Sequence, residues 1–350
     1  MNIMNSSSIG PNEIKADGFT VLAQGGGENA LFEYARLSDF LFDQLNVSSI
    51  VLIHGLGGHP RDTWTYRNKT TGNVSDDSKY GLRKVFKHKK RNTDHLEVPR
   101  GKEEDLYWPG ELLAKDFKDA RIMTYGYDSQ IARSIGSAAN QNTISSHGNN
   151  LLNRLARERS SDPRRPLIFI AHSLGGLVLK RALINSRSTI ADNQDLRNIY
   201  ECTLGIIFFG TPHRGGSDLA SWGLLASRIV KAFGLDVNDR ILRSLTGDDG
   251  ILDDLAADFS KMLGDKAFHV DTFQEEREFH GLPGFTGKIV PAASSALQDA
   301  RERIHGINAN HVDMCRFSGQ EDEGYKATNG AVTRYMASWN RLLTEESVGQ

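Results

Sequence analysis

Three short runs of this chain are continuously apolar, and they constrain the fold more than any other feature. They are Ile50–Ile53, Leu167–Ile170 and Ile206–Phe209. A strand with one face in water alternates apolar and polar residues, whereas a continuous apolar run suits a strand that is buried on both faces. The sequence therefore predicts a parallel sheet that is covered by helices on both sides.

Further strand and helix patterns alternate along the chain. Expected strands are Arg121–Tyr125, Phe268–Phe273 and Lys288–Val290. One expected helix begins at Pro109, and two others cover Asn142–Glu158 and Leu174–Ile184. This alternation predicts the α/β fold class, with a mostly parallel sheet and helices on both faces.

Composition narrows the classes of function. The 350 residues carry a formal charge of −2, which excludes a globally basic nucleic-acid binder. Cys202 and Cys315 have neither zinc-ligand nor disulfide-framework spacing, and they suggest a reducing compartment. The chain shows no secretory signal and no apolar run long enough for a bilayer. The expected location is the cytoplasm, with peripheral contact at membranes as an alternative.

The expected organisation is one domain over residues 17–340, with a disordered N-terminus over 1–16 and an exposed tail over 341–350. A polar insertion is expected over residues 66–106. It contains the basic run Arg83–Arg91, which is either a solvated loop or a docking site for anionic lipid headgroups.

The segment Ile168–Leu177 has the pattern of a nucleophile elbow. A buried strand leads into A-H-S over 171–173, and L-G-G over 174–176 opens a helix. A serine on so tight a turn needs small neighbours two positions to either side, and Ala171 and Gly175 meet that need. Ala171 departs from the usual glycine by one methyl group. Ser173 is therefore the candidate nucleophile; the alternative is a surface serine on a Gly-rich turn.

A serine nucleophile needs a base, and the base needs an orienting acid. In this architecture the chain order is nucleophile, acid, histidine. Glu275 and Glu276 lie just past the next expected strand; Glu275 is favoured because it is closer to the strand end, and Asp271 lies within the strand. His311 is favoured as the base because it lies on a loop, whereas His305 lies in a charged run with a helical pattern.

Two backbone amides must also face the carbonyl oxygen of a substrate. Leu174, directly after the nucleophile, is one expected donor, and Leu56, in the Gly-rich loop after the first apolar run, is the other. A phosphate cradle is the competing interpretation of that loop, but it lacks the Lys-Ser/Thr of a P-loop. Other expected motif or substrate-lining residues are His54, Gly55, His172, Gly175, Thr211, Pro212 and His213. The loop that holds the last three is alternatively a structural turn.

Together these motifs resemble a known family. I-H-G-L-G-G over 53–58, A-H-S-L-G-G over 171–176 and F-F-G-T-P-H-R-G over 208–215 look like the lipase-like serine esterases of the α/β-hydrolase superfamily. The run 307–318 is similar to the N-terminal hydrolase domains of fungal NLR-type (NACHT or NB-ARC) proteins. The resemblance implies Ser173 as nucleophile, Glu275 as acid and His311 as base, with Leu56 and Leu174 at the oxyanion hole.

These observations predict a serine hydrolase of the esterase or lipase type, which cleaves carboxylic esters through an acyl-enzyme and acts in lipid metabolism. No metal or organic cofactor is expected. The same triad would serve an acyltransferase or an amidase, and the resemblance also allows a cell-death or immune signalling module that oligomerisation activates. Expected partners are an ester or lipid substrate, an anionic membrane surface through Arg83–Arg91, and either a second copy or a fused NLR-type sensor, but no nucleic acid.

Overall fold

The computed structural model describes residues 13–25, 48–68, 105–129, 137–214, 228–229, 251–266, 268–280 and 287–348. The basic run Arg83–Arg91 and most of the expected insertion lie outside the described residues, so their predicted roles stay predictions.

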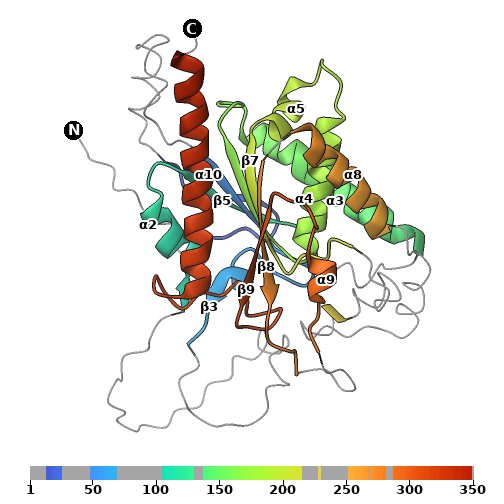
Figure 1. Ribbon diagram of the computed structural model, residues 1–350, viewed down its shortest axis with the longest axis vertical. Helices are drawn as coiled ribbons and strands as arrows, with labels where there is room; N and C mark the ends of the chain where they lie inside the picture. The colour runs from blue at the N-terminus through green and yellow to red at the C-terminus, as the bar shows by residue number, and fades with distance from the viewer. Residues whose placement is uncertain are drawn as a thin grey trace, which may run out of the picture.

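A seven-stranded sheet forms the centre of the molecule (Figure 1). Its strands are β1 (Gly18–Ala23), β2 (Ser49–Ile53), β5 (Arg121–Gly126), β6 (Leu167–His172), β7 (Thr203–Phe209), β8 (His269–Glu275) and β9 (Glu302–Ile307). The spatial order is β1-β5-β2-β6-β7-β8-β9, and β1 runs antiparallel to β5 while all other neighbours are parallel. A short separate ladder joins β3 (Thr65–Tyr66) to β4 (Leu106–Tyr107).

Helices cover both faces of this sheet (Figure 1). One face carries α3 (Ser137–Glu158), α4 (Leu174–Arg187), α5 (Gln194–Glu201) and α8 (Ile251–Asp265). The other carries the long α10 (Glu323–Val348), a 3₁₀ turn (Asp62–Trp64), and a π-helical turn (Pro109–Leu113) that leads into α2 (Ala114–Asp116). A short helix, α9 (Ala292–Ser295), lies near the end of β8. This is the predicted architecture, and it is an α/β-hydrolase fold.

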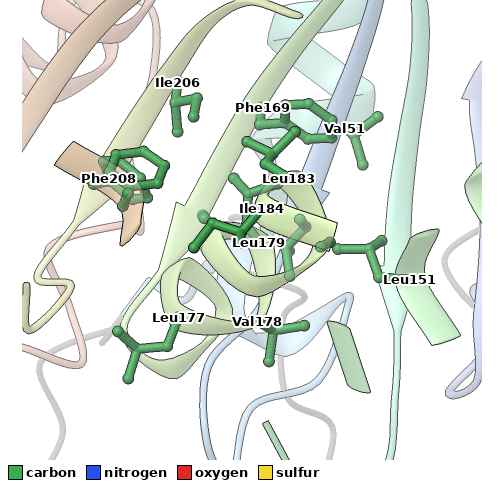
Figure 2. Close-up of a cluster of buried hydrophobic side chains, with 14 of the residues drawn as sticks. Val51, Leu151, Phe169, Leu177, Val178, Leu179, Leu183, Ile184, Ile206 and Phe208 are labelled. Carbon is green, nitrogen blue, oxygen red and sulfur yellow. The ribbon is translucent and has the colours of Figure 1, made fainter. Parts of the chain in front are cut away.

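The central strands are buried on both faces, as their apolar runs predict. Val51, Phe169 and Phe208 belong to the core under α3 and α4, where they pack with Leu183 (Figure 2). Their neighbours in the chain point the other way and belong to the core under α10, as Ile170 does. Because successive side chains alternate between two apolar cores, the apolar runs within these strands leave no position for a polar residue.

The prediction for the last strand is wrong. Lys288–Val290 forms a bend, and the charged run around His305, expected to be helical, forms the last strand, β9. This strand lies at the edge of the sheet and its side chains are mostly partly or fully exposed, with Ile304 at 53%. An edge strand in contact with water does not need the apolar run that identified its neighbours.

Other differences concern the two ends of the chain. The antiparallel strand β1 has no counterpart among the expected strands, and α10 continues to Val348, through most of the segment expected to be a tail. Within the described ranges, no helix combines the length and the hydropathy needed to cross a membrane.

Candidate active site

Ser173 lies on a tight turn between β6 and α4. Its backbone has φ 53° and ψ −125°, a left-handed conformation that L-residues rarely adopt. Such a conformation costs on the order of 1–3 kcal/mol and persists when the surroundings enforce it. Here the Ser173 amide donates to the carbonyl of Phe209 at 2.8 Å, and the Ser173 carbonyl accepts from the Gly176 amide at 3.0 Å. The elbow therefore fixes the serine at the carboxyl edge of the sheet.

Glycines around the elbow allow backbone segments to approach closely. A Cβ at Gly175 would overlap the carbonyl oxygen of His54, and a Cβ at Gly55 would lie 2.8 Å from that of Ser173. These contacts bring the loop after β2 against the nucleophile. They are the physical reason for the small residues that the motif contains.

The structure brings Ser173, His311 and Glu275 together, although they come from three separate parts of the chain. Nε2 of His311 lies 3.0 Å from Oγ of Ser173, which is hydrogen-bonding distance. Nδ1 of His311 lies 3.7 Å from Oε1 of Glu275, within the range of an ion pair but beyond that of a hydrogen bond. The side chains of His311 and Glu275 are 0% and 1% exposed. The imidazole of His311 thus lies between the serine hydroxyl and the Glu275 carboxylate.

Glu275 and Glu276 point to different surroundings. Glu275 is the last residue of β8, and its Oε1 also accepts a hydrogen bond from the amide of Val290 at 2.5 Å. The carboxyl group of Glu276 instead occupies the space beside Gly306 of β9. Of the two carboxylates, Glu275 is the one that the structure places at His311.

The competing histidine, His305, is engaged elsewhere. Its Nε2 lies 2.7 Å from Oδ1 of Asp271. Oδ1 also accepts a hydrogen bond from Arg334 of α10, and Oδ2 accepts one from the hydroxyl of Tyr335. Burial by itself raises the pKa of Asp271, but the hydrogen bonds from His305, Tyr335 and Arg334 outweigh it and hold the pKa below its ordinary 3.8. The cluster connects β8, β9 and α10, which indicates a structural role for both His305 and Asp271.

Replacing Asp271 by asparagine is expected to lower the free energy of unfolding by about 1–3 kcal/mol at pH 7, because charged hydrogen bonds to a buried carboxylate are lost. A carboxyl group whose pKa is lower in the folded state stabilises the protein at pH values above its unfolded-state pKa. This stabilisation is lost as the pH falls through the folded-state pKa. The difference between wild type and Asp271→Asn should therefore shrink below about pH 3.8. Urea unfolding at neutral and acidic pH measures it.

Glu323→Gln is the control for that experiment, because Glu323 forms an exposed pair with Lys326 on α10. Such pairs contribute about 0–1 kcal/mol. If Asp271→Asn lowered the free energy of unfolding at pH 7 by no more than Glu323→Gln does, the Asp271 cluster would not stabilise the contact of β8 and β9 with α10.

The two expected oxyanion donors lie close to the elbow. Leu56 and Leu174 are each 2% exposed, and no hydrogen bond joins either backbone amide to another described residue. A buried amide without a partner is unusual, so two beside one serine suit a role in binding a ligand oxygen. The loop is held by Tyr127, whose hydroxyl donates to the carbonyl of His54 at 2.9 Å and whose ring stacks on His54.

The remaining motif residues are buried around the elbow. His54 is buried, which lowers its pKa to about 4, so the ring is neutral. The Thr211 hydroxyl donates to the carbonyl of Ser173 at 3.2 Å, and its side chain fills the space beside Gly176. Pro212 is buried, and His213 packs edge-on against Phe208. Thr211 therefore supports the elbow, and a substrate-lining role for this loop stays a prediction.

Sequence reasoning missed Lys180, a buried lysine on α4. Its ammonium lies 4.7 Å from the ring centre of Phe259, and burial lowers its pKa to about 7 although Glu302 partly opposes that shift. The sequence contained a signal: Lys180 lies three residues from both Leu177 and Leu183, on the buried stripe of the helix.

Within the part of the chain that the structure describes, no group of His, Cys, Asp and Glu is arranged to hold a metal ion.

Comparisons with known proteins find remote relatives of this chain. No family model matches the chain. Protein SERAC1 of Danio rerio is 26% identical over 284 residues, and that of Homo sapiens is 27% identical over 288 residues; each alignment covers 80% of this chain and 38% of the relative. The chain therefore spans less than half the length of these relatives.

Solved structures with similar folds include a Bacillus licheniformis lipase, BlEst2 in mature form, with a TM-score of 0.47 and 14% identity over 85% of this chain and 96% of that one. A type II thioesterase, YbtT, has a TM-score of 0.40 and 12% identity over 91% of this chain and 98% of that one.

Proposed function

We propose that this protein is a serine hydrolase that cleaves carboxylic esters. The observation that carries the proposal is the hydrogen-bonding distance of 3.0 Å between Ser173 Oγ and His311 Nε2, with Glu275 behind the imidazole. The strained elbow, which fixes the serine, supports the proposal further, as do the amides of Leu56 and Leu174, which have no partner among the described residues.

The proposed reaction begins with the attack of Ser173 Oγ on the ester carbonyl carbon. His311 Nε2 takes the hydroxyl proton, and the amides of Leu56 and Leu174 stabilise the negative oxygen of the tetrahedral intermediate. The carbon–oxygen bond to the alcohol then breaks, and His311 returns the proton to the leaving alkoxide. Water, activated by His311, attacks the acyl-Ser173 ester and releases the acid.

Glu275 has an orienting role in this proposal. A histidine that accepts the serine proton at Nε2 must carry its own proton at Nδ1, the nitrogen nearest Glu275. The buried carboxylate favours this tautomer and stabilises the imidazolium that forms.

Ser173→Ala is expected to abolish hydrolysis of p-nitrophenyl esters, with a loss of kcat on the order of 10⁴-fold or more. Wild type and variant are compared across acyl-chain lengths, and the chain-length optimum then distinguishes an esterase from a lipase. Because alanine removes one oxygen from a well-packed elbow, a matching unfolding curve serves as the control. Equal turnover in the two folded proteins would refute the assignment of the nucleophile.

An acyltransferase or an amidase would use the same groups, and the product formed with amines or alcohols in place of water distinguishes them. The link to fungal NLR-type proteins, a role in lipid metabolism and binding to anionic membranes stay predictions.

A further inference from the structure

His172, the residue before the proposed nucleophile, contacts the loop that carries the proposed base. It is the last residue of β6, and its Nε2 lies 2.9 Å from the backbone carbonyl oxygen of His311, 139 positions further along the chain. Both residues are fully buried, and their ring centres lie 5.0 Å apart. The contact therefore joins the strand of the serine directly to the loop of the base.

The chemistry of the contact fixes the proton on His172. A carbonyl oxygen accepts hydrogen bonds and cannot donate, so Nε2 of His172 must carry the hydrogen. Burial holds the pKa of His172 well below 6.5, and the neighbouring positive charge of a protonated His311 would lower it further. A neutral ring has one N–H group, and here it is committed to His311. A neutral His172 also avoids repelling the imidazolium that His311 becomes during the reaction.

The turn that carries His311 has few other links to the elbow. Asn310 accepts hydrogen bonds from Val312, Asp313 and Met314, all within the same turn. The turn follows β9, which is an edge strand, so the sheet supports it from one side. A Cβ at Gly210 would lie 2.9 Å from Nδ1 of His311, so the glycine allows the backbone after β7 to approach the His311 ring closely. The bond from His172 thus ties the backbone of the turn to the strand that ends at Ser173.

We propose that His172 is a positioning residue, which holds the backbone of His311 so that its Nε2 stays aligned with Ser173 Oγ. The proposal rests on the serine hydrolase function proposed above. Without the hydrogen bond, a buried carbonyl loses its partner and the turn can shift relative to the serine. A displacement near 1 Å costs up to about 100-fold in rate. His172 is fully buried, so substrate binding should not depend on it.

The test compares His172→Phe with His172→Gln. Phenylalanine keeps a planar ring but cannot donate, and it is expected to lower kcat by on the order of 10- to 100-fold with KM unchanged. Glutamine places an amide N–H at a similar reach, and it is expected to recover most of that loss. His269→Phe is the control: His269 stacks on Tyr335 of α10, away from the site, so this change should leave kcat unaltered.

A second arm does not depend on turnover. The ring nitrogens of His172 are assigned by ¹H–¹⁵N NMR of wild type, where the proposal expects a neutral ring with its proton on Nε2. A proton on Nδ1 would overturn the proposal, and so would wild-type kcat in folded His172→Phe or a change confined to KM. Equal turnover of Ser173→Ala and wild type would show separately that the proposed function is wrong. The NMR experiment would in that case still show whether Nε2 of His172 carries the proton that the hydrogen bond requires.

Discussion

Replacing His311 by asparagine is expected to lower kcat for ester hydrolysis by on the order of 10⁴-fold or more, because among the described residues only His311 offers a side-chain base within hydrogen-bonding distance of Ser173 Oγ. The imidazole of His311 lies 3.0 Å from Ser173 Oγ, and an asparagine side chain cannot accept a proton at neutral pH. Steady-state kinetics on the ester that wild type hydrolyses best measures the effect.

His305→Asn is the matched control for that change. His305 lies on β9, the strand that precedes the turn of His311. Its Nε2 lies 2.7 Å from Oδ1 of Asp271. Its replacement should reduce stability and leave kcat of the folded protein essentially unchanged. If turnover disappeared in His305→Asn and survived in His311→Asn, the base would have been assigned to the wrong histidine.

Gly175→Ala is expected to destabilise the protein by about 3 kcal/mol, which is the upper part of the usual range for overpacking. The added Cβ would overlap the carbonyl oxygen of His54, a backbone atom that cannot rotate away. That carbonyl also accepts the hydroxyl of Tyr127 at 2.9 Å, so moving it would disturb a second contact. Urea unfolding measures the loss, and residual activity should fall with it because the elbow is distorted.

Gly330→Ala, in contrast, is expected to stabilise the protein. Gly330 is an exposed residue of α10, and an added Cβ there meets nothing within 4 Å. Alanine in a helix is more stable than glycine by up to about 1 kcal/mol. Equal stability of Gly175→Ala and wild type would contradict the close packing on which the elbow depends.

The centre of the fold followed from local patterns, and the same patterns selected Ser173 and His311 as candidate site residues. A strand buried on both faces requires an apolar run, and β2, β6 and β7 each show one. Ser173 could be located because a strained turn needs small neighbours at fixed positions. His311 could be located because a loop after the end of the sheet can reach the carboxyl edge, where the elbow lies.

Features that depend on long-range contacts could not be predicted in this way. The strand β9 is charged because it lies at an edge, so its pattern resembles that of a surface helix. The partner of Asp271 depends on the packing of α10 against β8, which no short segment encodes. The contact between His172 and His311 joins residues that only the folded sheet brings together.

Covalent labelling with a fluorophosphonate, followed by peptide mass spectrometry, shows directly whether Ser173 is an activated nucleophile. The reagent forms a stable phosphonate ester with an activated serine and requires no knowledge of the natural substrate. We expect one adduct, on the peptide that contains Ser173, and none in folded Ser173→Ala. An adduct that persists in Ser173→Ala, or folded wild type that remains unlabelled, would contradict it.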